Sequence, residues 1–454
     1  MGVKRLKDIP GFNIDRVAAA AGNDRDVLRL ENLDTDIPPP AEAVEATRAA
    51  VGDDDANSWL PFTGRDDLKE AVAAYIERRG GPRYDARREI VITGGEGDAM
   101  LDALFCLTDP GDEVILTDPT YAGMLNRVRL AGASPRLVPL RVTGADWRLD
   151  VDALAAAVGP RTRVVFVNNA SFPSGWVASD EEWSAVAAIC RERDLWLLYW
   201  GGFEGVLYDG HRIRHPAALP GMRDRTVTVG SPSLEQRMIA WRVGWVVAPG
   251  ELVNDLSRVH IYNGLVPSGF AQVGTRAALR LSDEHVAAAN REYRRRRDET
   301  LRQLDGLPAV RPAGGWSLLL DVAALGLDCV EFSNRLLAQK VAATPMRGWG
   351  GPVADRHVRS SSATSPSRDW PCSATAFAVR SGDCTCHPQT PPVILTSTSS
   401  SAAGMSRIAV SRSGSPAAPS GSSSRAPRLC RRSWADWATS TTTRSTCPVG
   451  TIAP

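Results

Sequence analysis

The residues best suited to chemistry lie in the segment SPSLEQRMIAWRVGW, at positions 231–245. Its serine pair, Ser231 and Ser233, offers two hydroxyls, and Arg242 offers a planar fork of donors that suits a phosphate or a carboxylate. Between them lies Leu234, eight positions before Arg242, whose side chain can neither condense with an aldehyde nor carry a proton. The segment therefore contains groups that could hold an anion, but its central residue is not a nucleophile.

The histidine, aspartate and glutamate residues of the chain form no metal-binding pattern. None of the histidines has the spacing of a metal site, and the six are His211, His215, His260, His285, His357 and His387. His211 and His215 lie in HRIRHP, which we predict to be an exposed loop with solvated histidines. Glu96, Asp98 and Glu204 could supply acid or base groups, but the sequence alone does not bring them together. We therefore expect no metal.

The length and charge of the chain disfavour several classes of protein. With 454 residues, of which 43% are hydrophobic, the chain is long enough for one large domain and a smaller one. A formal net charge of +1 gives no reason to expect nucleic-acid or membrane partners. The first residues lack the apolar core of a signal peptide, and no apolar run reaches membrane-spanning length. We predict a soluble cytoplasmic protein in which Cys106, Cys190 and Cys329 are buried free thiols.

From about residue 88, short β-rich segments alternate with amphipathic helical segments. Strands are predicted at EIVIT, DEVILTD, TRVVFVN, DLWLLYW, TVTVG and RVGWVVAP. Strands that are buried on both faces and separated by helices are typical of a parallel sheet, so we expect a doubly wound, mostly parallel α/β sheet. In the helix after the first strand, the expected apolar stripe consists of Ala99, Leu101, Leu104 and Phe105.

The rest of the chain predicts a second, smaller region. We expect long helices at about 250–281 and 283–304, and REYRRRRDE at 291–299 is typical of a solvated helix face. GWSLLLDV then begins a smaller α+β domain. The predicted divisions are an N-terminal segment packing with the small domain (1–45), a large domain (46–280), an interdomain helix with a truncated small domain (281–359), and a low-complexity tail (360–454).

The composition changes abruptly at Ser360. Residues 360–454 are rich in serine and threonine, contain no lysine or glutamate, and show no hydrophobic periodicity. This composition is typical of a disordered tail. A second hypothesis is out-of-frame translation, because one added nucleotide after the Arg359 codon could restore RFVFSNEPVERLAVLGDRVRRAL, a strand followed by an amphipathic helix. Sequencing the gene across this codon would decide between the two.

Six segments occur in an order that is typical of one enzyme family. They are WLPFTGRDDLKEAV, TGGEGDAM, TDPTYAGM, NNASFPSGWV, LLYWGGFEGVLYDG and SPSLEQRMIAWRVGW. From about residue 25 to 359 the chain thereby resembles the class I and II aminotransferases, which are fold-type-I pyridoxal phosphate (PLP) enzymes. The resemblance implies a fold-type-I PLP-transferase architecture, PLP as the cofactor, and amino-group transfer between amino acids and 2-oxo acids as the ancestral activity.

Two positions depart from what that chemistry needs. The resemblance puts Leu234 where the family has the lysine that bonds to the cofactor and moves the substrate proton. It puts Trp200 where a carboxylate holds the protonated pyridine nitrogen. An indole can donate a hydrogen bond but cannot act as an anionic partner, and its bulk should intrude on the ring's site.

The remaining implied cofactor positions are mixed. Residues that fit the pattern are Tyr121, which would stack on the pyridine ring, Ser231, Ser233 and Arg242 near the phosphate, and Arg359, which would pair with a substrate carboxylate. Residues that depart from it are Phe172, Phe203, Trp59 on the segment that would reach the partner subunit, and Glu96 and Gly97 in the phosphate cup, which also includes Gly95. In this cup Gly97 lacks the usual hydroxyl, and the charge of Glu96 should weaken phosphate binding.

Three hypotheses of function follow. The first is an aminotransferase-family protein that cannot transaminate, a pseudoenzyme that forms a homodimer or a heterodimer with an intact homologue. The second is a cofactor-independent enzyme or ligand-binding protein that holds a small amino-acid-like ligand between Tyr121, Trp200, Phe203 and Arg359, with Glu96 or Glu204 as its acid or base. The third is an active PLP-dependent aminotransferase whose sequence has been altered.

Overall fold

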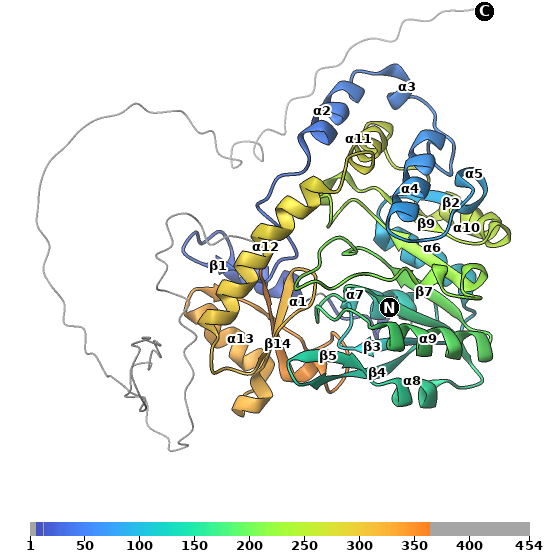
Figure 1. The fold of residues 1–454 in the computed structure, drawn as a ribbon. Helices are drawn as coiled ribbons and strands as arrows, with labels where there is room; N and C mark the ends of the chain where they lie inside the picture. The colour runs from blue at the N-terminus through green and yellow to red at the C-terminus, as the bar shows by residue number, and fades with distance from the viewer. Residues whose placement is uncertain (1–5, 12, 364–454) are drawn as a thin grey trace, which may run out of the picture. The chain divides into compact units, whose positions relative to one another are not determined.

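The largest element of the structure is an eight-stranded sheet. The computed structural model describes residues 6–11 and 13–363, so most of the predicted tail lies outside the described residues. The strands of the sheet follow the order β2-β9-β8-β7-β6-β3-β4-β5 (Figure 1). Their bounds are β2 (Ile90–Thr93), β9 (Gly244–Val247), β8 (Thr226–Gly230), β7 (Trp196–Trp200), β6 (Thr162–Asn168), β3 (Glu113–Asp118), β4 (Ser134–Thr143) and β5 (Asp146–Leu149).

The directions of these strands decide where their ends meet. Neighbouring strands from β8 through β7, β6 and β3 to β4 are parallel, whereas β2–β9, β9–β8 and β4–β5 are antiparallel pairs. Because β9 is antiparallel to both of its neighbours, β2 runs in the same direction as β8. The carboxyl ends of β2, β8, β7, β6 and β3 therefore meet at one edge of the sheet. The predicted doubly wound, mostly parallel α/β fold is confirmed.

Helices pack against this sheet and bury its apolar strands. The bounds of the helices are α1 (Asn13–Ala21), α2 (Ala41–Ala50), α3 (Asp54–Asn57), α4 (Asp66–Arg78), α5 (Ala86–Glu89), α6 (Glu96–Leu107), α7 (Ala122–Leu130), α8 (Val151–Ala157), α9 (Asp180–Glu192), α10 (Gly250–Asn263), α11 (Gly269–Leu279), α12 (Glu284–Gln303) and α13 (Cys329–Ala338). The main core joins strand residues such as Val164, Leu198 and Val227 to helix residues such as Met100 and Val186. In the described part of the chain, no helix combines the length and the apolar character needed to cross a membrane.

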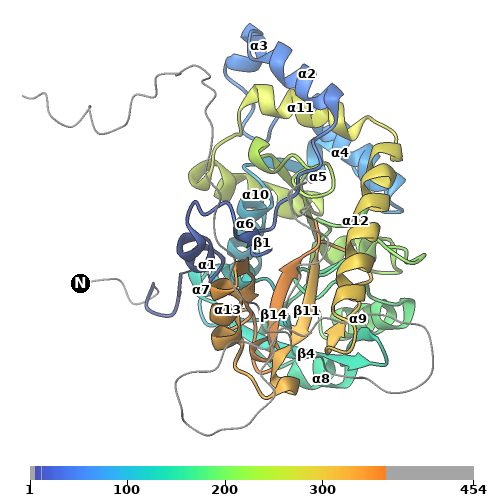
Figure 2. The same ribbon diagram turned by 90° about the vertical axis from the view of Figure 1, so that its left-hand side faces the viewer.

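A smaller sheet lies beside α13 (Figure 2). Its antiparallel strands follow the order β10 (Ala309–Val310), β11 (Ser317–Asp321), β14 (His357–Ser361) and β13 (Thr344–Pro345). The N-terminal segment joins this region because β1 (Leu28–Arg29) pairs in parallel with β12 (Val341–Ala342). Strand β14 extends past Ser360, where the composition changes, and Ser361 at its end pairs with Ser317. The domain divisions at 45, 280 and 359 stay predictions.

Two helix predictions were wrong. The single helix expected at about 250–281 is two helices, α10 and α11, because Gly264 and Pro267 interrupt it. In α6 the stripe is misplaced, because Phe105 is exposed and Leu101 only half-buried, while Met100 and Ala103 are fully buried. Helix α6 is covered by α10 as well as by the sheet, so its buried surface is wider than one stripe.

Three expectations about polar and thiol side chains also need correction. Arg297, within the predicted solvated run, is completely buried, and its guanidinium donates to both Asp209 carboxylate oxygens at 2.7 and 3.0 Å. His215 is buried rather than solvated and packs edge-on against the ring of Tyr199. Of the three predicted buried free thiols, Cys190 and Cys329 are buried and Cys106 is only half-buried, and all three are free.

Candidate functional site

Most of the predicted site residues lie where the parallel strands end. Trp200 is the last residue of β7, and Ser231 follows the last residue of β8. Tyr121 precedes α7 shortly after β3, and Glu96 begins α6 after β2. Since these strands run in one direction, their carboxyl ends bring together residues that are far apart in the sequence.

Four rings form an aromatic cluster at this edge. We use the name for Tyr121, Phe172, Trp200 and Trp349. The Tyr121 ring lies 5.4 Å from Trp200, 5.9 Å from Phe172 and 6.3 Å from Trp349, measured between ring centroids. Phe172 also packs edge-on against Trp349 at 5.4 Å. Trp200, Phe172 and Trp349 are each at most 2% exposed, so the cluster is part of the core.

Arg359 lies against this cluster without a carboxylate ion pair among the described residues. Its guanidinium carbon is 5.2 Å from the Phe172 ring and 5.8 Å from the Trp349 ring. It donates to the Glu31 carbonyl, to Thr344 Oγ1 at 3.2 Å and, more weakly, to Ser317 Oγ at 3.3 Å. Its Nε has no partner, and burial lowers the pKa of Arg359 to about 10, a fall that the nearby charge of Glu31 partly opposes. The cation therefore has neutral hydrogen-bond acceptors and two rings as its direct contacts, and the charge of Glu31 acts on it from beyond ion-pair distance.

A second group of residues surrounds the carboxylate of Glu96. We call Glu96, Ser231, Arg127 and Arg242 the Glu96 cluster. The Ser231 hydroxyl donates to Glu96 Oε2. Burial raises the pKa of Glu96, and the Ser231 hydrogen bond and the charges of Arg242 and Arg127 partly oppose this rise. The Trp200 Nε1 also lies near this carboxylate and favours its charged form, although it makes no hydrogen bond of normal geometry.

The two glycines of the predicted cup allow close approach of the arginines. Gly95 has φ +118°, and a Cβ built on it would lie 2.6 Å from Arg242 Nη2. A Cβ built on Gly97 would lie 2.4 Å from Arg127 Nη2, and Arg127 Nε donates to the Gly97 carbonyl at 2.8 Å. At Gly97, where the resemblance would put a hydroxyl-bearing side chain, the space is taken by the Arg127 guanidinium.

The other predicted positions differ in their surroundings. Leu234 is 3% exposed and belongs to the main core, while the amide of neighbouring Ser233 donates to Ser231 Oγ at 3.2 Å. Phe203 packs edge-on against Trp316 at 5.4 Å. Trp59 is 78% exposed and packs edge-on only against Phe62 among the described aromatic rings. The structure thus groups the residues of the aromatic cluster, Arg359 and the Glu96 cluster, but leaves Trp59 on the surface.

Sequence reasoning missed two members of this arrangement. Trp349 lies in a turn with no family motif, and Arg127 lies on α7 without any local signal. Arg127 reaches the site on α7, and the turn of Trp349 is held at the end of β3, where the Thr120 amide donates to the Trp349 carbonyl at 2.7 Å. The one available hint for Arg127 was its position six residues after Tyr121, on the helix that Tyr121 precedes.

The titratable group Glu204 lies in a separate buried network. Tyr199 Oη donates to Glu204 Oε1 at 2.6 Å. Burial raises the pKa of Glu204 to about 7, and the charge of Glu235 adds to the rise, while the Tyr199 hydrogen bond and Arg79 oppose it. Glu235 itself accepts from Tyr75 Oη at 3.0 Å. No group of three His, Cys, Asp or Glu side chains in the described residues could hold a metal ion.

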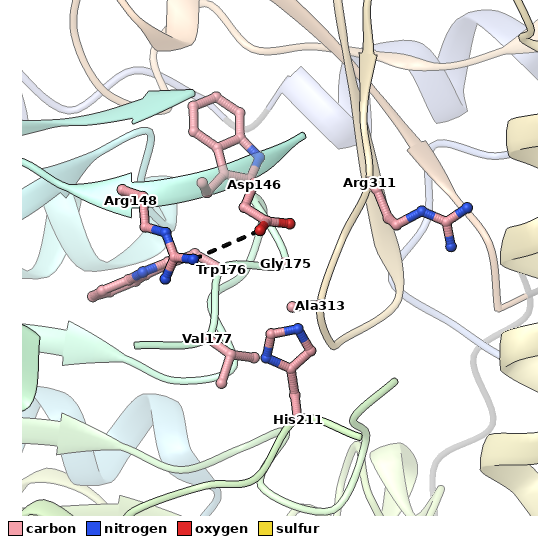
Figure 3. A pocket seen from close by; sticks show the side chains of 9 residues that line it. Asp146, Arg148, Gly175, Trp176, Val177, His211, Arg311 and Ala313 are labelled. Carbon is pink, nitrogen blue, oxygen red and sulfur yellow. Dashed lines mark ion pairs between the residues drawn. The ribbon is translucent and has the colours of Figure 1, made fainter. Parts of the chain in front are cut away.

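Of three surface hollows in the described part of the chain, one borders the aromatic cluster at Trp349 and two lie away from it. One, close to the ion pair between Arg148 and Asp146, has room for about one water molecule at about 10 Å³ (Figure 3). Next to it a hollow of about 460 Å³ shares the lining residues Arg148, Val177 and His211. A third, of about 270 Å³, touches Trp349 from the outside. None of these hollows is lined by a residue of the Glu96 cluster or by Arg359.

Comparison with known proteins identifies the family. Residues 26–368 match the family model described as aminotransferase class I and II. Arginine–pyruvate transaminase AruH of Pseudomonas aeruginosa is 32% identical over 348 residues, which cover 76% of this chain and 87% of that protein. Aromatic-amino-acid aminotransferase 2 of Thermococcus litoralis is 30% identical over 365 residues, covering 79% and 93%.

A solved structure agrees with these relatives. N-succinyldiaminopimelate aminotransferase from Mycobacterium tuberculosis is 30% identical, covers 80% of this chain and 96% of its own, and superposes with a TM-score of 0.77. Both the fold and the matched length are therefore those of aminotransferases. The chain belongs to the class I and II aminotransferase family.

Proposed function

We propose that this member of the family does not transaminate and acts as a pseudoenzyme subunit. The family implies PLP, which supplies an aldehyde that bonds to an amine and a ring that takes up electrons. The observation that carries the proposal is Leu234, which is buried in the core at the position assigned to the lysine. No amine is present there to bond to the cofactor or to move a substrate proton.

The other lysines of the chain do not replace the missing one. The sequence contains four, Lys4, Lys7, Lys69 and Lys340. Lys69 is buried, donates to Thr63 at 3.2 Å and pairs with Asp66 at 2.8 Å. Lys340 pairs with Asp24, and Lys7 is exposed. Lys4 lies outside the described residues.

Two further features disfavour the binding of PLP. Trp200 fills the end of β7 and packs against the Tyr121 ring, which the family resemblance assigns to stacking on the pyridine. Ser231, assigned to the phosphate, already donates to the Glu96 carboxylate. The residues present thus do not fit the pyridine, the phosphate or the covalent bond, and we derive no catalytic step through PLP.

The test is to incubate the purified chain with PLP, reduce it with borohydride and look for a covalent adduct by mass spectrometry. We expect no adduct that maps to the strand-end site, and no transamination. In the triple variant Leu234→Lys, Trp200→Asp and Glu96→Ala, an amine and a carboxylate return and Ser231 loses the carboxylate that occupies it, so a mapped adduct should form. Lys340→Arg is the control for surface labelling, because Lys340 is half exposed. Stoichiometric adduct at the site in the natural chain would contradict the proposal.

A pseudoenzyme of this family would act through a partner. We propose a homodimer or a heterodimer with an intact homologue in the cytoplasm. Trp59 and Tyr262 support this assembly, because they are 78% and 91% exposed, which is unusual for large aromatic side chains outside an interface. The test is sedimentation of the purified chain, where a monomer at micromolar concentration that also fails to bind intact homologues would contradict it.

Arg359 favours a second candidate function, the binding of a small amino-acid-like carboxylate. A buried guanidinium without an ion pair in the described residues, with its Nε unpartnered, is a costly arrangement that a ligand carboxylate would relieve. Its position between two rings of the aromatic cluster suits an aromatic acid. Calorimetry with aromatic amino and oxo acids tests it, with Arg359→Lys as the variant, and absence of saturable binding would remove this candidate.

A further inference from the structure

The start of α6 has the features of an anion site that already contains an anion. Gly95 turns the chain with φ +118°, and the helix that follows is twelve residues long, so its first turn collects free amides and the positive end of the helix dipole. Ser231 donates a hydroxyl into this place from the end of β8. The group that receives it belongs to the chain itself, the carboxylate of Glu96.

The charges around this carboxylate point to the same conclusion. Arg242 and Arg127 both stabilise the charged form of Glu96 through space. Neither arginine forms an ion pair with an acidic side chain among the described residues, and their guanidiniums donate to the carbonyls of Ile239, Gly97 and Gly123. The two guanidiniums, which lie against Gly95 and Gly97 on either side of Glu96, and the Ser231 hydroxyl thus surround one half-buried carboxylate.

We infer that the Glu96 carboxylate is a built-in occupant of an anion site formed by Ser231, Arg242 and Arg127, and that it excludes phosphate from this site. The inference rests on the proposed function, in which the family's phosphate position no longer holds PLP. The inference adds that the phosphate position keeps its binding groups and that the Glu96 side chain alone closes it. Without that side chain, the site would take inorganic phosphate or a phosphate monoester.

The physical reason is electrostatic. A dianion that entered beside ionised Glu96 would meet a like charge a few ångströms away in a poorly solvated place. If Glu96 is removed, the same dianion would meet two guanidiniums, the Ser231 hydroxyl and the amides of the first turn of α6. We therefore expect phosphate to bind at least about tenfold more tightly, which corresponds to about 1.4 kcal/mol.

The experiment is calorimetric titration of the full chain with inorganic phosphate near neutral pH. Natural protein should show no saturable binding, whereas Glu96→Ala should bind, and Glu96→Gln should bind more weakly because its amide still fills the space. The matched control is Asp98→Ala, which removes a carboxylate from the same first turn of α6 but one that does not accept from Ser231. It should behave like the natural protein.

Adding Ser231→Ala to Glu96→Ala should abolish the gained binding, which locates the phosphate in the cluster. The inference is overturned if Glu96→Ala and Glu96→Gln bind phosphate no better than the natural protein, if Asp98→Ala gains as much, or if the Ser231 change has no effect. Inorganic phosphate has no aldehyde, so these results are independent of Leu234. A covalent PLP adduct in the natural chain would refute the proposed function but would leave the phosphate titrations as the test of Glu96.

Discussion

Replacing Ser360 by alanine should stabilise the protein. Ser360 lies on β14, two residues after Val358, and pairs in register with Leu318 on β11. Alternation along the strand therefore points Ser360 to the same face as Val358, which is part of the apolar core beneath α13. Ser360 is 7% exposed, and its Oγ has no hydrogen-bond partner.

The size of the effect follows from the unpaired hydroxyl. A buried hydroxyl without a partner costs about 1–3 kcal/mol relative to water. Alanine removes it without adding volume, and the loss of one oxygen's packing contacts offsets part of the gain. We expect the free energy of unfolding to rise by about 1 kcal/mol, measured by urea denaturation followed by tryptophan fluorescence.

Ser317→Ala is the matched control, because it removes the same group from the neighbouring strand. Ser317 is also buried, but its Oγ accepts from Arg359 Nη1 at 3.3 Å. Because this acceptor is one of the few partners of the buried Arg359 cation, its removal should lower the free energy of unfolding by about 1 kcal/mol. The reasoning is refuted if Ser360→Ala is no more stable than the natural protein, or if both variants shift in the same direction.

Two further predictions concern buried charges. Arg297→Ala should lower the free energy of unfolding by about 3 kcal/mol, because it removes a fully buried side chain and the bidentate partner of Asp209, which keeps only its ion pairs with Arg294 and Arg311. Arg295→Ala, on the exposed face of α12, should change it by less than about 1 kcal/mol, and equal losses in urea denaturation would contradict this. The folded chain raises the pKa of Glu204 from 4.5 to about 7, so it holds this proton more tightly than the unfolded chain. The contribution of Glu204 to the free energy of unfolding is therefore fully present below pH 4.5 and falls by up to about 3 kcal/mol as the pH rises to 7. Glu204→Gln should remove this pH dependence from the free energy of unfolding measured by denaturation across the same range.

The sequence was sufficient for those parts of the fold that depend on local patterns. Each predicted apolar run became a strand of the large sheet, because a run of apolar residues buried on both faces leaves little alternative. The same strand pattern predicted that three site residues lie close together, namely Tyr121, Trp200 and Ser231. Trp200 ends such a run, Ser231 directly follows one and Tyr121 comes three residues after one, and the ends of parallel strands meet at one edge.

The sequence was insufficient where a side chain depends on a distant partner. The charged run in α12 looked solvated, but Arg297 is buried because Asp209, in a loop after β7, reaches it. His260 is buried for the same reason, since its Nδ1 lies 2.9 Å from Asp102 Oδ2 on α6. Neither pair has any local pattern. Trp349 entered the aromatic cluster in the same way, from a turn that the sequence could not place.

Unusual residues occur both at the strand-end site and in the segment after Arg359, and their surroundings differ. At the strand-end site, the departures from the family pattern are accommodated by their neighbours: Glu96 accepts from Ser231, and Trp200 packs on Tyr121, although its indole N–H lacks a partner. Complementary changes of this kind are expected where a site has adapted to the loss of a ligand.

The segment after Arg359 differs. The hydroxyls of Ser360, on β14, and Ser362, just after it, are buried without partners among the described residues, and the alternative reading frame would place phenylalanine at both positions. The altered reading frame stays a prediction, and it implies that repairing the frame should stabilise the protein by replacing these hydroxyls with apolar side chains.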